Sequence, residues 1–258
     1  MGLGKWIGGA IGFMAMGPLG ALAGYALGSM FEDASNLKNG SDNASVDMND
    51  AYGQRNSFLF SMLVMASYII RADGKIMHSE MEFVRNFLRR NFGEAAVREG
   101  ESILLNLFEQ RKQMEMTNPN AFKNTIAECG AQMSSYLSHE ELLQMLNFLA
   151  MIAASDGDVC AAEVEALKEV ATYMGLSTAE VDSILNMGGD SVEDAYKVLE
   201  IAPTATDSEV RSAYKRLALK HHPDRVAALG EDIRRAAEVK FQQVNNAKER
   251  IYKARGMK

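Results

Sequence analysis

The chain has 258 residues, of which 47% are hydrophobic and 24% are charged. This ordinary globular composition excludes a wholly disordered, collagen-like or purely coiled-coil protein, and two cysteines cannot by themselves form a disulfide scaffold or a zinc site. The net charge of −7 argues against a nucleic-acid partner. The charge is uneven, however, because residues 193–258 contain 14 Lys and Arg against 10 Asp and Glu. A basic C-terminal unit therefore follows an acidic body.

The N-terminal segment has the composition of a membrane helix. No charged residue occurs from Trp6 to Phe31. A helix of that length rises roughly 39 Å, and the hydrocarbon core of a bilayer needs about 20 such residues. We therefore expect a transmembrane helix over residues 1–31, while a cleaved signal peptide and a soluble Gly-rich hairpin remain as alternatives.

Glycines recur at every fourth position of this segment. Small residues at that spacing line one face of a helix and let a second helix approach closely. We therefore expect the transmembrane helix to form a homodimer. The glycines of this packing face are Gly4, Gly8, Gly12, Gly20, Gly24 and Gly28.

The middle of the chain is expected to be a helical domain on a tether. Residues 32–56 are rich in Asn, Asp, Ser and Gly and predict a flexible linker. Residues 57–187 are expected to form a helical domain, because apolar residues recur at helical spacing in five of its segments, and the scarcity of proline supports an all-α fold. These segments are 58–70, 83–92, 102–108, 142–152 and 164–174. Part of this domain is duplicated, because the segment from Ala72 to Glu80 is matched by that from Ser155 to Glu163 at an offset of 83 residues.

Each copy of the repeat contains an Asp-Gly turn between two helices. In the first copy Ser79 and Glu82 have the spacing of a capping box, whereas Ala162 replaces the serine in the second copy, where we expect no such cap. The acidic side chains are either helix-boundary residues or oxygen ligands of a divalent cation. The candidate ligands are Asp73, Glu80, Asp156, Asp158 and Glu163. The doubled motif resembles the TerB family, named for tellurite resistance, and this resemblance implies that the acidic residues bind metal.

The C-terminal residues 190–258 predict three helices. Ser191 and Asp194 have the spacing of a cap for a short first helix, and Thr206 and Glu209 form a capping box for a second, basic helix. Pro223 helps to end that helix because it disfavours helical geometry at the preceding residue. A third helix, expected from about residue 231, would place its apolar stripe against the second.

Four motifs of this region resemble the J domain of the DnaJ co-chaperones. They are Tyr196-x-x-Leu199, the run from Ala213 to Ala218, the triplet His222-Pro223-Asp224 and the pair Lys240-Phe241. The chain departs from the family in the longer stretch from residue 226 to 232 and in Lys248, where the family usually has an aromatic residue. The resemblance implies that the chain binds a DnaK-type partner and stimulates the ATP hydrolysis of that partner. It also implies that the chain itself is not an enzyme.

The basic helix and the triplet form the candidate partner-binding site. Cations on one helix face can steer the domain toward an acidic surface, and the proline-stiffened loop presents an imidazole and a carboxylate. We expect the binding residues to be Arg211, Lys215, Arg216, Lys220, His222, Pro223, Asp224 and Arg225. No recognisable nucleophile, zincin or phosphate-loop motif accompanies the four histidines.

The order of the three parts resembles DjlA-like membrane-anchored co-chaperones. This resemblance implies a single-pass protein of the bacterial inner membrane with a cytoplasmic J domain. The alternative is a TerB-type membrane protein that responds to metal or tellurite stress and recruits the chaperone. These two functions are compatible with each other.

Overall fold

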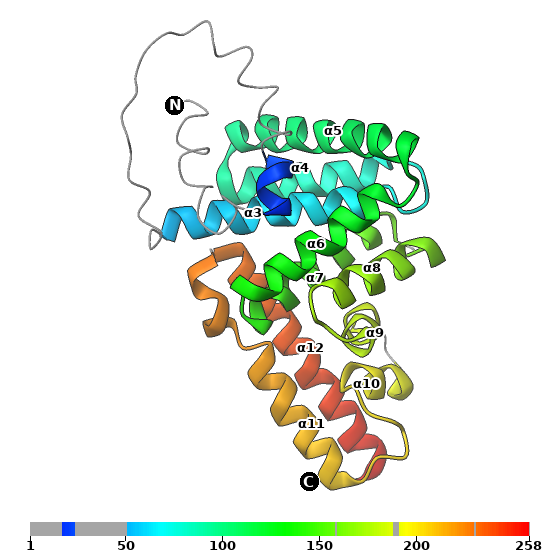
Figure 1. Cartoon of the computed structure of the whole chain (residues 1–258). Helices are drawn as coiled ribbons and strands as arrows, with labels where there is room; N and C mark the ends of the chain where they lie inside the picture. Colours follow the sequence, from blue (N-terminus) through cyan, green and yellow to red (C-terminus); the bar gives the residue numbers. More distant parts are fainter. Residues whose placement is uncertain (1–16, 24–50, 158, 188–190, 230, 258) are drawn as a thin grey trace, which may run out of the picture.

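The computed structural model describes residues 17–23, 51–157, 159–187, 191–229 and 231–257, and within these ranges every regular element is a helix. The expected all-α fold is confirmed. Figure 1 shows an upper group of helices, which is the TerB-like domain, and a lower group that contains the basic C-terminal helices. The helices of the upper group are α3 (Ala51–Ile69), α4 (His78–Phe92), α5 (Glu94–Thr117), α6 (Ala121–Tyr136), α7 (His139–Ala153), the 3₁₀ helix η1 (Ala154–Asp156) and α8 (Ala161–Tyr173). The last helix of the TerB-like domain, α9 (Thr178–Asn186), lies below them and contacts both α8 and the lower group.

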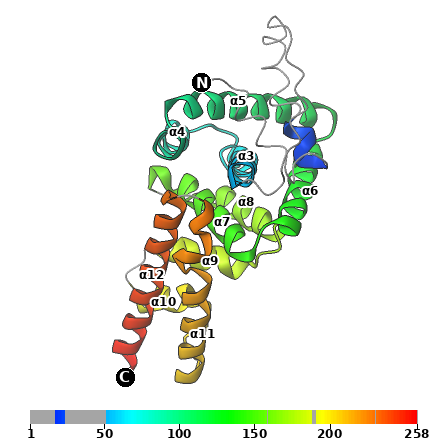
Figure 2. The same ribbon diagram turned by 90° about the vertical axis from the view of Figure 1, so that its left-hand side faces the viewer.

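Helix α3 is the centre of the upper group. Every residue from Phe58 to Ile70 is buried, so this helix is apolar on all sides, as expected of a helix enclosed by others. Helices α5, α6, α7 and α8 contact it. Figure 2 looks along α3 and shows the other helices around it. Since α3 begins at Ala51, the predicted boundary of the linker at residue 56 is wrong: residues 51–56 belong to the helix.

A short piece of the N-terminal segment packs on this domain. Residues 18–23 are helical, and Leu19 and Leu22 are buried in the core. The Leu19 N–H donates to Gln132 Oε1 of α6 at 3.1 Å. No helix within the described ranges is long and apolar enough to cross a bilayer. The rest of the predicted helix at 1–31 lies outside those ranges, as do all of the repeated glycines except Gly20, which is half-buried.

The two copies of the repeat adopt the same local structure. Gly74 and Gly157 have φ values of 82° and 108°, in the left-handed region where a side chain would be strained. The Glu80 carboxylate accepts from the Met77 N–H at 2.9 Å, and the Glu163 carboxylate accepts from the Cys160 N–H at 2.7 Å.

These contacts correct the predicted caps. In the first copy the cap lies two positions before the predicted Ser79, which is inside α4. The second copy has the equivalent cap at Cys160, although the sequence predicts none there. Ser and Thr are the usual signals of a capping box, so a box built on Met or Cys is not recognised from its first residue.

The lower group has the predicted three-helix arrangement. Its elements are α10 (Val192–Val198), α11 (Asp207–Lys220), the 3₁₀ helix η2 (Pro223–Leu229) and α12 (Glu231–Arg255). The predicted caps at Ser191 and Thr206 are confirmed, because each side chain accepts from the backbone N–H three residues later. Helices α11 and α12 lie side by side (Figures 1 and 2). Lys248 places its ammonium 4.8 Å from the ring centroid of Tyr214, so a cation–π contact stands where the DnaJ family usually has an aromatic residue.

Arg255 fastens the end of α12 to the other two helices of this group. Its guanidinium donates to the Pro203 carbonyl at 2.8 Å and to Asp207 at 3.2 Å, and it lies over the Tyr196 ring. We expect Arg255→Ala to lower the melting temperature by a few degrees because all of these contacts are lost together. Thermal unfolding followed by circular dichroism tests this, with the exposed neighbour Lys253→Ala as the matched control. Equal melting temperatures for the two variants would contradict it.

Candidate functional site

The His-Pro-Asp loop is a compact turn at the end of α11. The Asp224 N–H donates to His222 Nδ1 at 3.3 Å, and the Arg225 N–H donates to the His222 carbonyl at 3.1 Å. The imidazole rests edge-on against Phe241 of α12, with 5.6 Å between the ring centroids. The side chain of His222 is 43% exposed and that of Asp224 is 85% exposed. The loop is therefore held rigidly while its two functional side chains remain reachable.

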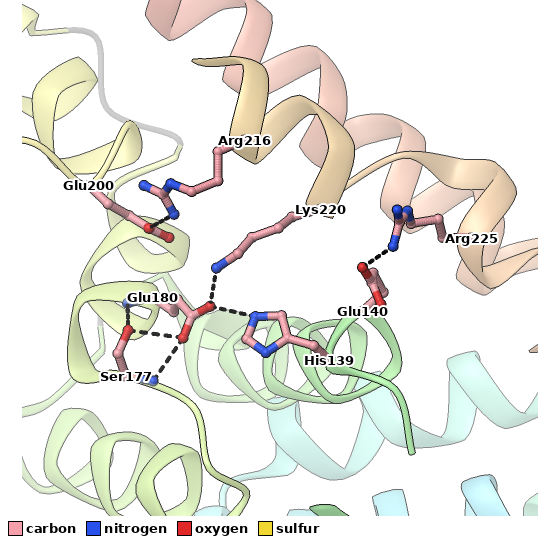
Figure 3. A network of polar contacts seen from close by, with 8 residues as sticks. All are labelled: His139, Glu140, Ser177, Glu180, Glu200, Arg216, Lys220 and Arg225. Carbon is pink, nitrogen blue, oxygen red and sulfur yellow. Dashed lines mark hydrogen bonds and ion pairs between the residues drawn. The ribbon is translucent and has the colours of Figure 1, made fainter. Parts of the chain in front are cut away.

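The predicted cations fall into two sets. Arg211 and Lys215 are exposed and form no ion pair with a described residue, and Arg216 pairs with Glu200 of its own domain at 2.5 Å. Lys220 and Arg225, in contrast, reach the TerB-like domain (Figure 3). Lys220 Nζ donates to Glu180 Oε1 of α9 at 2.6 Å, and Arg225 pairs with Glu140 of α7.

Glu180 is the centre of the first of these contacts (Figure 3). It caps α9 by accepting from the N–H and the hydroxyl of Ser177, and His139 Nε2 lies 2.8 Å from Oε1. Burial raises the pKa of Glu180, but hydrogen bonds from Lys220 and from the Ser177 backbone outweigh that effect and lower the pKa to about 2. The carboxylate therefore stays ionised beside Lys220 at neutral pH.

His221, next to the loop, is buried and uncharged. Only 4% of it is exposed, and its Nδ1 has no hydrogen-bond partner. Burial, followed by the charges of Lys240 and Lys220, lowers its pKa to about 4 although Glu180 opposes the shift. His221 therefore contributes to packing, and His222 is the histidine that faces outward.

The predicted metal ligands do not form a recognisable site in the described part of the chain. No group of three or more His, Cys, Asp or Glu among the described residues is arranged to hold a metal ion, and Asp158 lies outside those residues. Glu80 and Glu163 both cap helices. Burial and the charges of Glu163, Asp73 and Asp156 nevertheless raise the pKa of Glu80 to about 7, although its hydrogen bond from Met77 lowers it. The carboxylates of the two repeat copies thus lie near enough for their charges to act on Glu80.

The residues of the body at the contacts with Lys220 and Arg225 were not predicted from the sequence. Glu140, Glu180 and His139 contribute to these contacts from positions 40 to 85 residues away in the chain. Glu180 carries a local signal, because Ser177 and Glu180 have the spacing of a capping box. Glu140 and Glu141 both lie in the first turn of α7, but capping-box spacing with Ser138 marks Glu141, and no local pattern marks Glu140 as a contact of the J domain.

Three protein-family models match the chain in successive segments. Residues 1–43 match the transmembrane domain of the co-chaperone DjlA, residues 60–186 match the tellurite resistance protein TerB, and residues 194–255 match the DnaJ domain. The N-terminal match identifies a membrane anchor. The TerB and DnaJ matches agree with the two groups of helices in the structure.

Two of the curated relatives align with the chain along nearly their whole length. The chain is 26% identical to a co-chaperone protein DjlA of Coxiella burnetii, over 99% of this chain and 98% of the relative. It is also 26% identical to one of Photobacterium profundum, over 99% of both proteins. A DjlA of Shewanella oneidensis is 33% identical over 46% of this chain and 52% of that protein. No solved structure matches the chain significantly. The order of the three domains and the full-length relatives together place the chain in the DjlA family of membrane-anchored J-domain co-chaperones.

Proposed function

We propose that the J domain of this chain binds a DnaK-type chaperone and stimulates its ATP hydrolysis. The observation that carries this proposal is the rigid, outward-facing His222-Pro223-Asp224 loop at the end of the basic helix α11. The chain contributes no catalytic group of its own to hydrolysis. Its contribution is binding energy that favours one conformation of the partner.

The charges and the loop have separate roles in this mechanism. The exposed cations Arg211 and Lys215 attract an acidic surface of the chaperone and accelerate encounter. The loop then offers the imidazole of His222 and the carboxylate of Asp224 to polar groups of the partner. If these contacts are stronger in the hydrolysis-competent state, that state becomes more populated.

The proposed placement follows from the partner. A DnaK-type chaperone is cytoplasmic, so the J domain is placed on the cytoplasmic side of a single-pass anchor in the bacterial inner membrane. The glycines at every fourth position of the anchor are proposed to pair two copies. Protease accessibility in spheroplasts tests the sidedness, and crosslinking in membranes tests the dimer.

Steady-state ATP turnover tests the proposed activity. The full chain, reconstituted in lipid vesicles, is titrated into a purified DnaK-type chaperone with ATP in excess. We expect turnover to rise saturably by about tenfold, which corresponds to about 1.4 kcal/mol of differential binding. A basal rate at every concentration of the chain would contradict the proposal.

A second candidate function is a metal response of the TerB-like domain that accompanies chaperone recruitment. It is supported by the raised pKa of Glu80, to which the negative charges of Glu163, Asp73 and Asp156 contribute and which a divalent cation would lower. We expect calorimetric titration of the full chain with calcium, magnesium or manganese to show binding, and Glu80→Gln to weaken it. The absence of heat at millimolar metal would exclude this candidate.

A further inference from the structure

We infer that the TerB-like domain restrains its own J domain by pairing its carboxylates with the two cations that flank the His-Pro-Asp loop. The chaperone must displace these carboxylates before it can bind the loop fully. This inference rests on the proposed function and adds its regulation: the chain would have a closed arrangement, which the structure describes, and an open one that the partner prefers.

The cations of the two ion pairs flank the loop in the sequence. Lys220 lies two residues before His222, and Arg225 directly follows Asp224 (Figure 3). Their partners are well shielded from water, because the side chains of Glu180 and Glu140 are only 5% and 17% exposed. Charge pairs are screened much less in such surroundings than on an open surface, so these contacts compete effectively with an external acidic partner.

Apolar packing supports the ion pairs. The 3₁₀ helix η2 lies against α3 and α7, and α12 lies against α4 and α7. Val226 of η2 is only 1% exposed. This residue begins the stretch that lengthens the chain after the loop relative to other J domains. The described start of this stretch therefore lies in the 3₁₀ helix that contacts the body.

The closed arrangement leaves a route for the partner to enter. Asp224 is exposed in the loop. Arg211 and Lys215 of α11 are also exposed and have no ionic partner among the described residues. A chaperone can first contact these two cations and then exchange its own carboxylates for Glu180 and Glu140. The measured affinity is then reduced by the fraction of molecules that are closed.

Variants of the body alone can test this restraint without altering the proposed binding residues. Glu140→Lys reverses the charge that faces Arg225. Glu180→Gln neutralises the partner of Lys220, while glutamine at this position can still cap α9. Glu165→Lys is the matched control, because Glu165 is exposed on α8 and forms no ion pair with a described residue of the J domain.

The experiment compares full-length chains in lipid vesicles by chaperone ATP turnover and by amide hydrogen exchange. For the double variant Glu140→Lys, Glu180→Gln we expect the half-maximal concentration to fall about tenfold with an unchanged plateau, and exchange in Pro223–Leu229 to accelerate. Glu165→Lys should behave as the native chain does. Circular dichroism confirms that each variant is folded.

The two readouts separate this inference from the proposed function. Unchanged exchange in the folded double variant would overturn the restraint, whatever the ATP turnover. Faster exchange with an unchanged or higher half-maximal concentration would also overturn it, because the opened loop would then bind no better. Basal turnover with every chain, native and variant, would instead refute the proposed function, and the inference that depends on it would fail for that separate reason.

Discussion

Replacing His222 by glutamine is expected to abolish stimulation of the chaperone and leave the chain folded. The imidazole is the exposed end of the loop, and it is fixed by its edge contact with Phe241 and by the Asp224 N–H that donates to Nδ1. Glutamine retains a polar side chain but lacks the ring that Phe241 supports. We expect ATP turnover to fall about tenfold, to nearly the basal rate, because the differential contact with the partner is lost.

The matched control is the same chemical change at another histidine. His78 is exposed at the start of α4 and has no part in the proposed binding surface. His78→Gln should stimulate the chaperone as the native chain does, and both variants should have native helix content. If His222→Gln stimulates as well as His78→Gln, the loop does not have the proposed role.

Acid is expected to destabilise the folded chain through His221. Burial lowers the pKa of His221 to about 4 from its ordinary value of about 6.5, with Lys240, Lys220 and His139 lowering it further and Glu180 opposing them. Below about pH 6.5 His221 is protonated in the unfolded chain but remains neutral in the folded chain. The free energy of unfolding therefore has its full value above pH 6.5 and decreases as the pH falls toward 4. The expected loss at pH 5 is about 2 kcal/mol. The ionised Glu180, whose pKa is about 2, adds its own loss only below about pH 4.5.

Urea unfolding of the full chain in mild detergent between pH 7.5 and pH 5 measures this dependence. His221→Gln removes the buried titrating group, so its free energy of unfolding should vary less with pH than that of the native chain. His78→Gln again serves as the control, because it makes the same chemical change at an exposed position of α4. A dependence in His221→Gln equal to the native one would show that another group is responsible.

The local features of the site can be predicted from sequence because neighbouring residues determine them. Ser191 and Thr206 cap helices with carboxylates three residues later, and both caps are present as expected. Pro223 similarly marks the end of the basic helix, which stops at Lys220. The apolar residues Ala237 and Val244 of α12 are buried at helical spacing, as the third helix requires.

The contacts between the two groups of helices could not be predicted. Glu140 and Arg225 are separated by 85 residues. The residues around Glu140 do not show whether its carboxylate faces solvent or pairs with a distant cation. Helix α6 is absent from the predicted apolar segments, although Phe122, Ile126 and Met133 are fully buried. These features depend on packing between segments that are far apart in the sequence. Local sequence patterns do not specify that packing.

The most direct test of the central claim is the single-turnover hydrolysis of ATP already bound to the chaperone. This measurement isolates the chemical step from nucleotide exchange, which steady-state turnover includes. With the full native chain in excess, we predict that bound ATP is hydrolysed about tenfold faster than by the chaperone alone, and that His222→Gln restores the slow rate. A single-turnover rate that is the same with the native chain, with the variant and with neither would contradict the account.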